Sequence, residues 1–195
     1  FKNTEVIIHL ANVANDPTVE LNPELSWNIN VLASMKICEL ASEAGVKKII
    51  FSSSGSVYGV KKEKKVTEQL SLKPISVYNK TKMVAERVFL SYKDKIDIFI
   101  IRPATVCGYS PRLRLDISIN LLTYQAFENK KIIVHGGKQI RPNIHINDLC
   151  RIFEFFSEKK NIEPGIYNAG FDNMSILSIA NKIKEKIACE VLIKK

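Results

Sequence analysis

Apolar and polar positions along this chain follow two periods, one typical of buried strands and the other of amphipathic helices. Short apolar runs at residues 6–10, 48–52 and 97–102 are typical of strands buried on both faces. Apolar residues at helical spacing follow Asn22-Pro23 and recur over residues 77–92, which predicts two helices between these strands. Strand and helix alternating through short links predict βαβ units and a parallel sheet.

Beyond Pro103 the pattern is less regular. The spacing still predicts helices over residues 117–129, 146–157 and 175–187, and extended segments over residues 132–135 and 165–168. Periodicity alone leaves open whether this part of the chain forms a separate lobe.

Composition narrows the class of protein. The chain has 195 residues, 46% hydrophobic and 25% charged, which is ordinary for a globular protein. Its net charge of +9 comes mainly from clustered lysines, which fit either a solvated surface or a positive field that attracts an anionic nucleotide. There is no basic stripe interleaved with aromatic residues, so we expect no nucleic-acid partner.

The cysteines and the apolar runs point to a reduced, cytoplasmic location. The four cysteines are widely spaced, with no C-x-x-C pair, so neither a metal site nor a disulfide framework is expected. No apolar run approaches the length that crosses a bilayer, and no signal-peptide pattern occurs. We therefore expect a cytoplasmic protein with no membrane partner.

Candidate chemistry centres on Tyr78-Asn-Lys-Thr-Lys82, a Y-x-x-x-K sequence at the start of a predicted helix. Residues four apart on a helix share one face, so this spacing places the ammonium beside the phenol. A free tyrosine, with a pKa of about 10, is a poor base at neutral pH, and a nearby cation lowers its pKa. A second match, Tyr58 to Lys62, contains Gly59 and lies in a polar segment, where spacing does not fix geometry.

The segment SSSGSVYG (residues 52–59), followed by Tyr78 and Lys82, resembles the active site of one enzyme family. This is the NAD-dependent nucleotide-sugar epimerase/dehydratase family of the extended short-chain dehydrogenase/reductase type, with members such as UDP-galactose 4-epimerase. Further similar segments occur in the family's order: VIIHLA (6–11), RPATVCG (102–108), INLL (119–122), RPNIHINDL (141–149) and GIYNAG (165–170).

The resemblance implies roles for individual residues. It implies catalytic roles for Ser54, Tyr78 and Lys82, with Ser54 as the catalytic hydroxyl, Tyr78 as general base or acid, and Lys82 as its electrostatic partner. It implies a nucleotide-diphosphate sugar as substrate and NAD as cofactor, with NADP as the alternative. Beside the catalytic residues, the implied cofactor contacts are Ala11, Asn12, Asn30, Ser52, Ser53 and Pro103, and the implied substrate contacts are Thr105, Asn120 and Arg141. His145, between two isoleucines, is expected to be structural.

The resemblance also implies a fold and its divisions. We expect an α/β protein with a partial Rossmann-like, doubly wound parallel sheet and a smaller C-terminal substrate-binding part. Residues 1–105 would form the second half of a dinucleotide-binding domain, and residues 106–195 mainly the substrate-binding part, which could return to the main sheet. The family's glycine-rich turn would lie several tens of residues before Phe1, so the chain is expected to be a piece of a longer one. Family analogy also predicts a possible homodimer.

Three activities stay open. The preferred one is an epimerase that moves a hydride and a proton at a sugar hydroxyl carbon. The alternatives are a one-way nucleotide-sugar reductase or dehydrogenase, and an inactive fragment without the cofactor-binding turn. Dehydration is disfavoured, because Gly55 and Ser56 stand where the family's dehydratases have an Asp-Glu pair.

Overall fold

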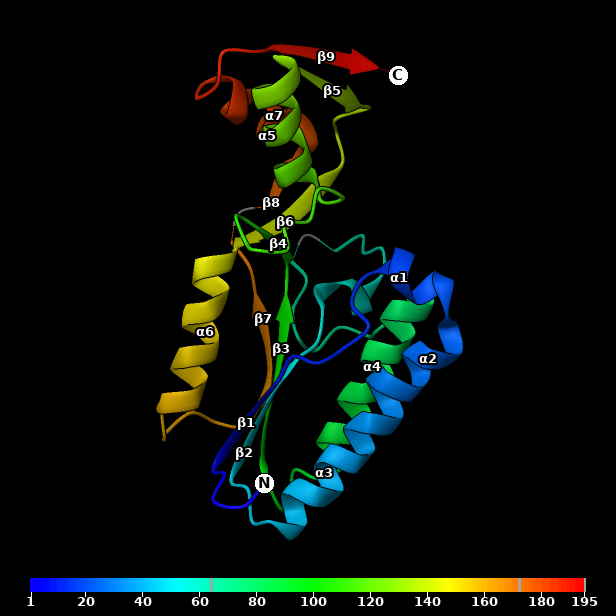
Figure 1. The fold of residues 1–195 in the computed structure, drawn as a ribbon, viewed down its shortest axis with the longest axis vertical. Helices are drawn as coiled ribbons and strands as arrows, with labels where there is room; N and C mark the ends of the chain where they lie inside the picture. Colours follow the sequence, from blue (N-terminus) through cyan, green and yellow to red (C-terminus); the bar gives the residue numbers. More distant parts are fainter. Residues whose placement is uncertain (64, 172, 195) are drawn as a thin grey trace. The chain divides into compact units, whose positions relative to one another are not determined.

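Parallel strands form the centre of the first of two units in the computed structural model, which describes residues 1–63, 65–171 and 173–194 (Figure 1). This unit comprises residues 1–103 and 151–169. Its sheet has the order β1-β2-β3-β7, and all the paired strands are parallel. The strands are β1 (Val6–His9), β2 (Lys48–Ser52), β3 (Asp97–Pro103) and β7 (Gly165–Ala169).

Helices cover both faces of this sheet (Figure 1). One face packs against α3 (Ala33–Glu43) and α4 (Val77–Leu90), which lie side by side. In β3, Ile98 and Ile100 point to that core, whereas Phe99 contacts Phe156 of α6 (Ile146–Glu158) on the other face. Burial on both faces explains why the central strands β2 and β3 are apolar runs.

Local capping signals set the helix boundaries. Asn22 accepts a hydrogen bond from Leu25 N at 2.9 Å and caps α2 (Pro23–Trp27), as its sequence predicts. A π-helical turn, η1 (Asn28–Leu32), then joins α2 to α3, and Gly45 follows the helix with a φ of 71°. A short helix, α1 (Asp16–Leu21), precedes them and was not predicted.

The second unit comprises residues 104–150 and 170–195. Its core lies between two helices, α5 (Ser118–Asn129) and α7 (Ile176–Lys184), and β5 (Lys131–His135), which pairs in parallel with β9 (Glu190–Lys194). A further sheet has the order β4-β6-β8, formed by β4 (Thr105–Cys107), β6 (Ile140–His145) and β8 (Asn173–Ser175).

The structure confirms the predicted α/β class and the parallel sheet. Both units are discontinuous in sequence: the chain leaves the first at Pro103 and returns through α6 and β7. The strands β4, β6, β8 and β9 were not predicted: β4 and β8 have only three residues each, and β6 and β9 are largely exposed, so none of them shows as a buried apolar run.

Candidate active site

The start of α4 carries the predicted Tyr-Lys pair and places its lysine at the carboxyl end of β2. Ser76 caps α4 by accepting from Asn79 N at 3.2 Å, so Tyr78 and Lys82 lie one turn apart at the helix start. Lys82 Nζ lies 5.9 Å from the centroid of the Tyr78 ring and donates to Ser52 O at 2.7 Å. The ammonium is therefore held beside the phenol, as the spacing predicted.

Burial makes the charge of Lys82 sensitive to pH. The side chain is 3% exposed, and burial lowers the pKa of Lys82 from 10.5 to about 7, while the negative charge of Glu86 opposes this shift. A lysine with such a pKa exists in both protonation states near neutral pH, so small changes in its surroundings change its charge.

Ser54 lies two residues after the end of β2 and caps a 3-10 turn, η2 (Gly55–Tyr58). Its Oγ lies 2.7 Å from Ser56 Oγ, and Ser56 Oγ donates to Asn79 Oδ1 at 2.5 Å. Because Asn79 is next to Tyr78 in α4, this chain of hydrogen bonds ties the candidate hydroxyl to the helix that bears the candidate base.

The loop after β1 contains polar groups without protein partners. Both polar atoms of the Asn12 side chain are buried and have no hydrogen-bond partner within the described residues. Nε2 of His9, at the end of β1, is also unpaired there, and burial, together with the charge of Lys82, lowers the pKa of His9 to about 4. His9 is therefore neutral at physiological pH, and Asn12 has unused donors and acceptors beside this loop.

Asn30 holds the same loop through hydrogen bonds. Its side chain is completely buried, accepts from Val13 N at 2.8 Å, and donates to Val13 O and Thr81 Oγ1 at 3.1 and 3.0 Å. The sequence predicted Asn30 as a cofactor contact. The structure places its polar atoms in bonds that join the loop after β1 to α4.

The other predicted residues of the first unit lie at the same strand ends. Ser53 N donates to Ile101 O at 2.7 Å, which holds Ser53 against β3, and Pro103 ends that strand. A Cβ on Gly55 would lie 3.1 Å from Pro103 O, a tight contact, so glycine suits this position. Ala11 belongs to the loop after β1 and is exposed.

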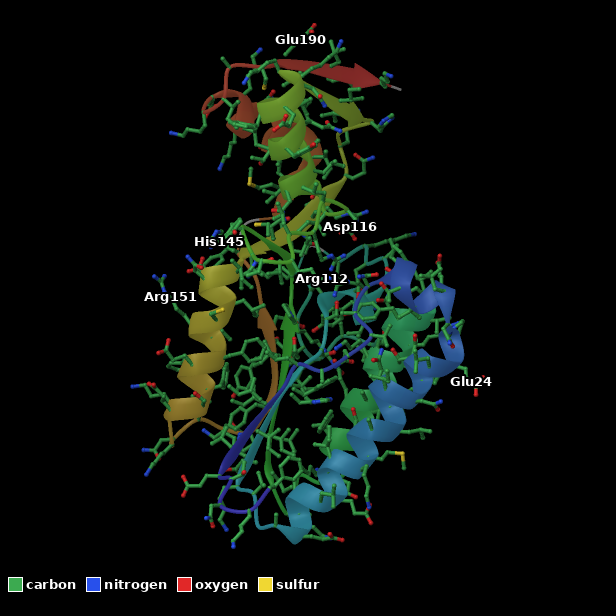
Figure 2. All side chains as sticks on the ribbon, in the orientation of Figure 1. Glu24, Arg112, Asp116, His145, Arg151 and Glu190 are labelled. Carbon is green, nitrogen blue, oxygen red and sulfur yellow. The ribbon has the colours of Figure 1, made fainter. Side chains whose placement is uncertain are left out.

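The remaining predicted residues belong to the second unit. Thr105 begins β4. Asn120, in α5, accepts from Gly108 N at 3.0 Å and donates to Arg114 O at 2.9 Å, which ties the preceding loop to the helix. Arg114 also pairs with Asp116 at 2.6 Å, and Asp116 is labelled in Figure 2. Arg141 lies on β6 with an exposed side chain.

Comparison with known proteins decides the family. The sequence profile of the NAD dependent epimerase/dehydratase family matches residues 1–170. The chain belongs to this epimerase/dehydratase family. The match confirms the family predicted from the motifs, and it covers the segments that contain Ser54, Tyr78 and Lys82.

Individual members of the epimerase/dehydratase family include enzymes of different reactions. The chain is 30% identical over 191 residues to a protein of Bacillus subtilis named uncharacterized UDP-glucose epimerase YtcB, covering 94% of this chain and 59% of that relative. It is 31% identical over 166 residues to the dTDP-D-glucose 4,6-dehydratase of Bos taurus, covering 82% and 45%.

The fold is also that of the family. The crystal structure of UDP-glucuronic acid 4-epimerase from Bacillus cereus, in complex with UDP-glucuronic acid and NAD, superposes with a TM-score of 0.81 at 29% identity. The superposition covers 98% of this chain and 62% of that protein. The chain thus spans 59% of the Bacillus subtilis relative and less than two thirds of this epimerase.

Sequence motifs did not show which residues form the hydrogen bonds around this site. The structure adds Val13, Ser56, Asn79, Glu86 and Arg102. Glu86 could have been suspected, because it lies four residues after Lys82 on the same helix face. Within the described residues there is no cluster of histidine, cysteine and carboxylate side chains fit for a metal, and no helix has the length and apolarity to cross a membrane.

Proposed function

We propose that the protein containing this chain is an NAD(P)-dependent nucleotide-sugar epimerase. The observation that supports this most strongly is the buried ammonium of Lys82, 5.9 Å from the centroid of the Tyr78 ring and bonded to the strand end that leads to Ser54. This arrangement favours ionisation of a phenol in a site where a hydroxyl is also available.

In the proposed reaction, Tyr78 takes the proton of a sugar hydroxyl while a hydride leaves the same carbon. NAD would supply the hydride acceptor for this step and the hydride donor for its reversal at the opposite face of the resulting ketone. Ser54 donates a hydrogen bond to the sugar oxygen, and Lys82 stabilises the phenolate. On return of the hydride, Tyr78 gives its proton back to the oxygen, so the sugar is isomerised without net oxidation.

The residues of the first unit fit such a cofactor. The unpaired side chain of Asn12 supplies a donor and an acceptor at the loop after β1, and a buried polar group without a partner is costly unless a ligand satisfies it. Within the described residues, the Lys82 ammonium donates to Ser52 O, and an ammonium has three donors. We propose that Ala11, Asn12, Ser52, Ser53, Tyr78, Lys82 and Pro103 line the cofactor site, with Asn30 holding its loop.

Two positions favour epimerisation over dehydration. Removal of water from a sugar needs an acid and a base beside the catalytic hydroxyl. Gly55 supplies no side chain, and the hydroxyl of Ser56 is bonded to Asn79 at 2.5 Å. Neither position provides a carboxylate, although the family includes dehydratases.

A nucleotide-diphosphate sugar is the proposed substrate. Relatives of this chain are named as epimerases of UDP-linked sugars, and a net charge of +9 favours anionic ligands. Arg141 and Asn120 are proposed to hold the diphosphate, since an arginine can donate two hydrogen bonds to phosphate oxygens, and Thr105 to contact the sugar. A homodimer and a cytoplasmic location stay predictions of the sequence.

The test is a Tyr78→Phe variant of the protein expressed from its complete reading frame, assayed with UDP-linked sugars and NAD. Loss of general acid–base catalysis lowers the rate by roughly 10² to 10⁴-fold, so we expect kcat to fall by at least about a hundredfold. Tyr124→Phe, at an exposed tyrosine of α5, is the matched control. Unchanged turnover of Tyr78→Phe refutes the proposed role, and net consumption of NAD(P)H identifies a reductase instead.

A further inference from the structure

A buried ion pair joins α4 and β3 next to the candidate active site. Arg102 Nε and Nη2 donate to the Glu86 carboxylate at 2.9 and 2.7 Å. Glu86 is 1% exposed and Arg102 is 3% exposed. Because a buried ion pair is often no more stabilising than an apolar pair of similar volume, its presence here points to a role beyond stability.

Glu86 shares a helix face with both members of the Tyr-Lys pair. Tyr78, Lys82 and Glu86 are spaced by four residues along α4, so they follow one another on successive turns. Lys82 binds Ser52 O at 2.7 Å, and Glu86 Oε1 accepts from Ser53 Oγ at 2.5 Å. Two neighbouring turns of the helix therefore hold two neighbouring residues of the strand end, and the next residue is Ser54.

The other side of the ion pair fixes Glu86 in place. Arg102 Nη1 donates to Tyr58 Oη at 2.7 Å, and Tyr58 Oη donates to Asn168 Oδ1 at 2.7 Å. Tyr58 ends η2, the turn that Ser54 caps, and Asn168 belongs to β7. The hydrogen bonds to Glu86 raise the pKa of Arg102 despite its burial, so the arginine stays charged. The position of the carboxylate is thus set by several elements of the first unit.

The charges around Lys82 make Glu86 its electrostatic counterpart. From β2, Lys82 faces the Ser52 carbonyl and the Phe51 ring, 4.9 Å from its centroid. From β1 it faces His9, which is neutral because its pKa is about 4. The negative charge of Glu86 raises the pKa of Lys82 against burial, and Arg102 is paired with that same carboxylate.

We propose that Glu86 is a positioning residue of this site: its carboxylate, fixed by Arg102, keeps Lys82 in the ammonium form beside Tyr78 and holds Ser53 next to Ser54. The inference rests on the proposed function, because Glu86 is buried and acts through Lys82 and Tyr78. Loss of its charge removes the anion that favours protonated Lys82, and Lys82 then gives up its proton more readily.

The experiment is Glu86→Gln in the protein from its complete reading frame. Glutamine still accepts a hydrogen bond from Ser53 or Arg102, but it has no charge. For two charges one helical turn apart in a buried site, we expect kcat at pH 8 to fall about tenfold or more, and the alkaline limb of the kcat profile to move down by about one pH unit. KM for the nucleotide sugar should not change, and Glu86→Asp should restore the profile.

Glu39→Gln is the matched control, because it removes the same charge from an exposed pair with Lys36 on α3. A Glu86→Gln profile parallel to that of the wild type overturns the inference. If Glu86→Gln does not fold, the double variant Glu86→Gln/Arg102→Met leaves no unpaired buried arginine, and an unshifted alkaline limb in that variant is equally decisive.

A readout without turnover separates this inference from the proposed function. If the pKa of Lys82 in the folded protein is lower, the unfolded protein binds more protons than the folded protein over a wider pH range. Lys82 titration alone makes the unfolding temperature of the wild type rise with pH above about 7, and in Glu86→Gln this rise should begin at lower pH. An identical onset in Glu86→Gln and Glu39→Gln refutes the role of Glu86, even if the protein turns over no nucleotide sugar.

Discussion

The buried Lys82 is expected to lower the stability of the folded protein, and the variant Lys82→Met tests this directly. Its pKa falls from 10.5 to about 7 on folding, because burial disfavours the charged form. Below pH 7 the side chain is charged in both states, so the full cost applies. Between pH 7 and 10.5 the cost declines as pH rises, and above 10.5 it is absent.

The magnitude follows from the size of this shift. A difference of about three and a half pKa units corresponds to roughly 5 kcal/mol, at about 1.4 kcal/mol per unit. Because Lys82 is 3% exposed, solvent screens little of it. Methionine leaves Ser52 O without its partner, which costs about 1–3 kcal/mol. We therefore expect Lys82→Met to be about 2–4 kcal/mol more stable than the wild type at pH 6 and to lose catalysis.

The assay is urea unfolding followed by circular dichroism from pH 6 to pH 10, with Lys80→Met as control. Lys80 lies on the same helix with an exposed side chain, so its replacement should change stability little at any pH. The advantage of Lys82→Met should shrink steadily above pH 7. A variant no more stable than the wild type at pH 6, or a gap independent of pH, would refute the reasoning.

Three further substitutions test how the elements around the site are held. Lys48→Met should lower the free energy of unfolding, measured by urea denaturation, by about 2–3 kcal/mol. The reason is that Lys48 Nζ donates to carbonyl oxygens at the end of α6 at 2.7 and 2.8 Å. A loss under about 0.5 kcal/mol contradicts this. Asn30→Leu should cost about 3 kcal/mol and speed proteolysis of the loop after β1, because Val13 N, Val13 O and Thr81 Oγ1 all lose their buried partner. A loss under about 1 kcal/mol counts against the reasoning. Gly59→Ala should lower the melting temperature more than Gly45→Ala. Both glycines have a positive φ, but only at Gly59 would the new Cβ overlap a backbone carbonyl, that of Lys73. Equal shifts of the melting temperature contradict this.

The sequence predicted the parts of the site that depend on local spacing. Tyr78 and Lys82 are one helical turn apart, so recognising the helix was enough to place the ammonium beside the phenol. The strand at residues 48–52 was likewise predicted with its observed bounds, because a strand buried on both faces leaves an uninterrupted apolar run.

Other features depend on which distant segments meet. The pair Glu86–Arg102 joins a helix and a strand, and nothing in either local sequence specifies that partner. Asn30 illustrates the same point, because its spacing shows only that it lies in a helix. In the folded protein, Val13 and Thr81 are the hydrogen-bond partners of both polar atoms of the Asn30 side chain.

By itself, the sequence determined the class of fold, the helix that bears Tyr78 and Lys82, and the family, because hydrophobic period, caps and i,i+4 spacing act over a few neighbouring residues. Tertiary structure alone decided that β7 returns beside β3, and that Lys82 loses its solvent while Glu86 supplies a compensating charge. The physical reason is that burial and charge pairing depend on contacts between segments far apart in the chain. The charge state of Lys82 is therefore a property of the folded protein, although its place in the motif is a property of the sequence.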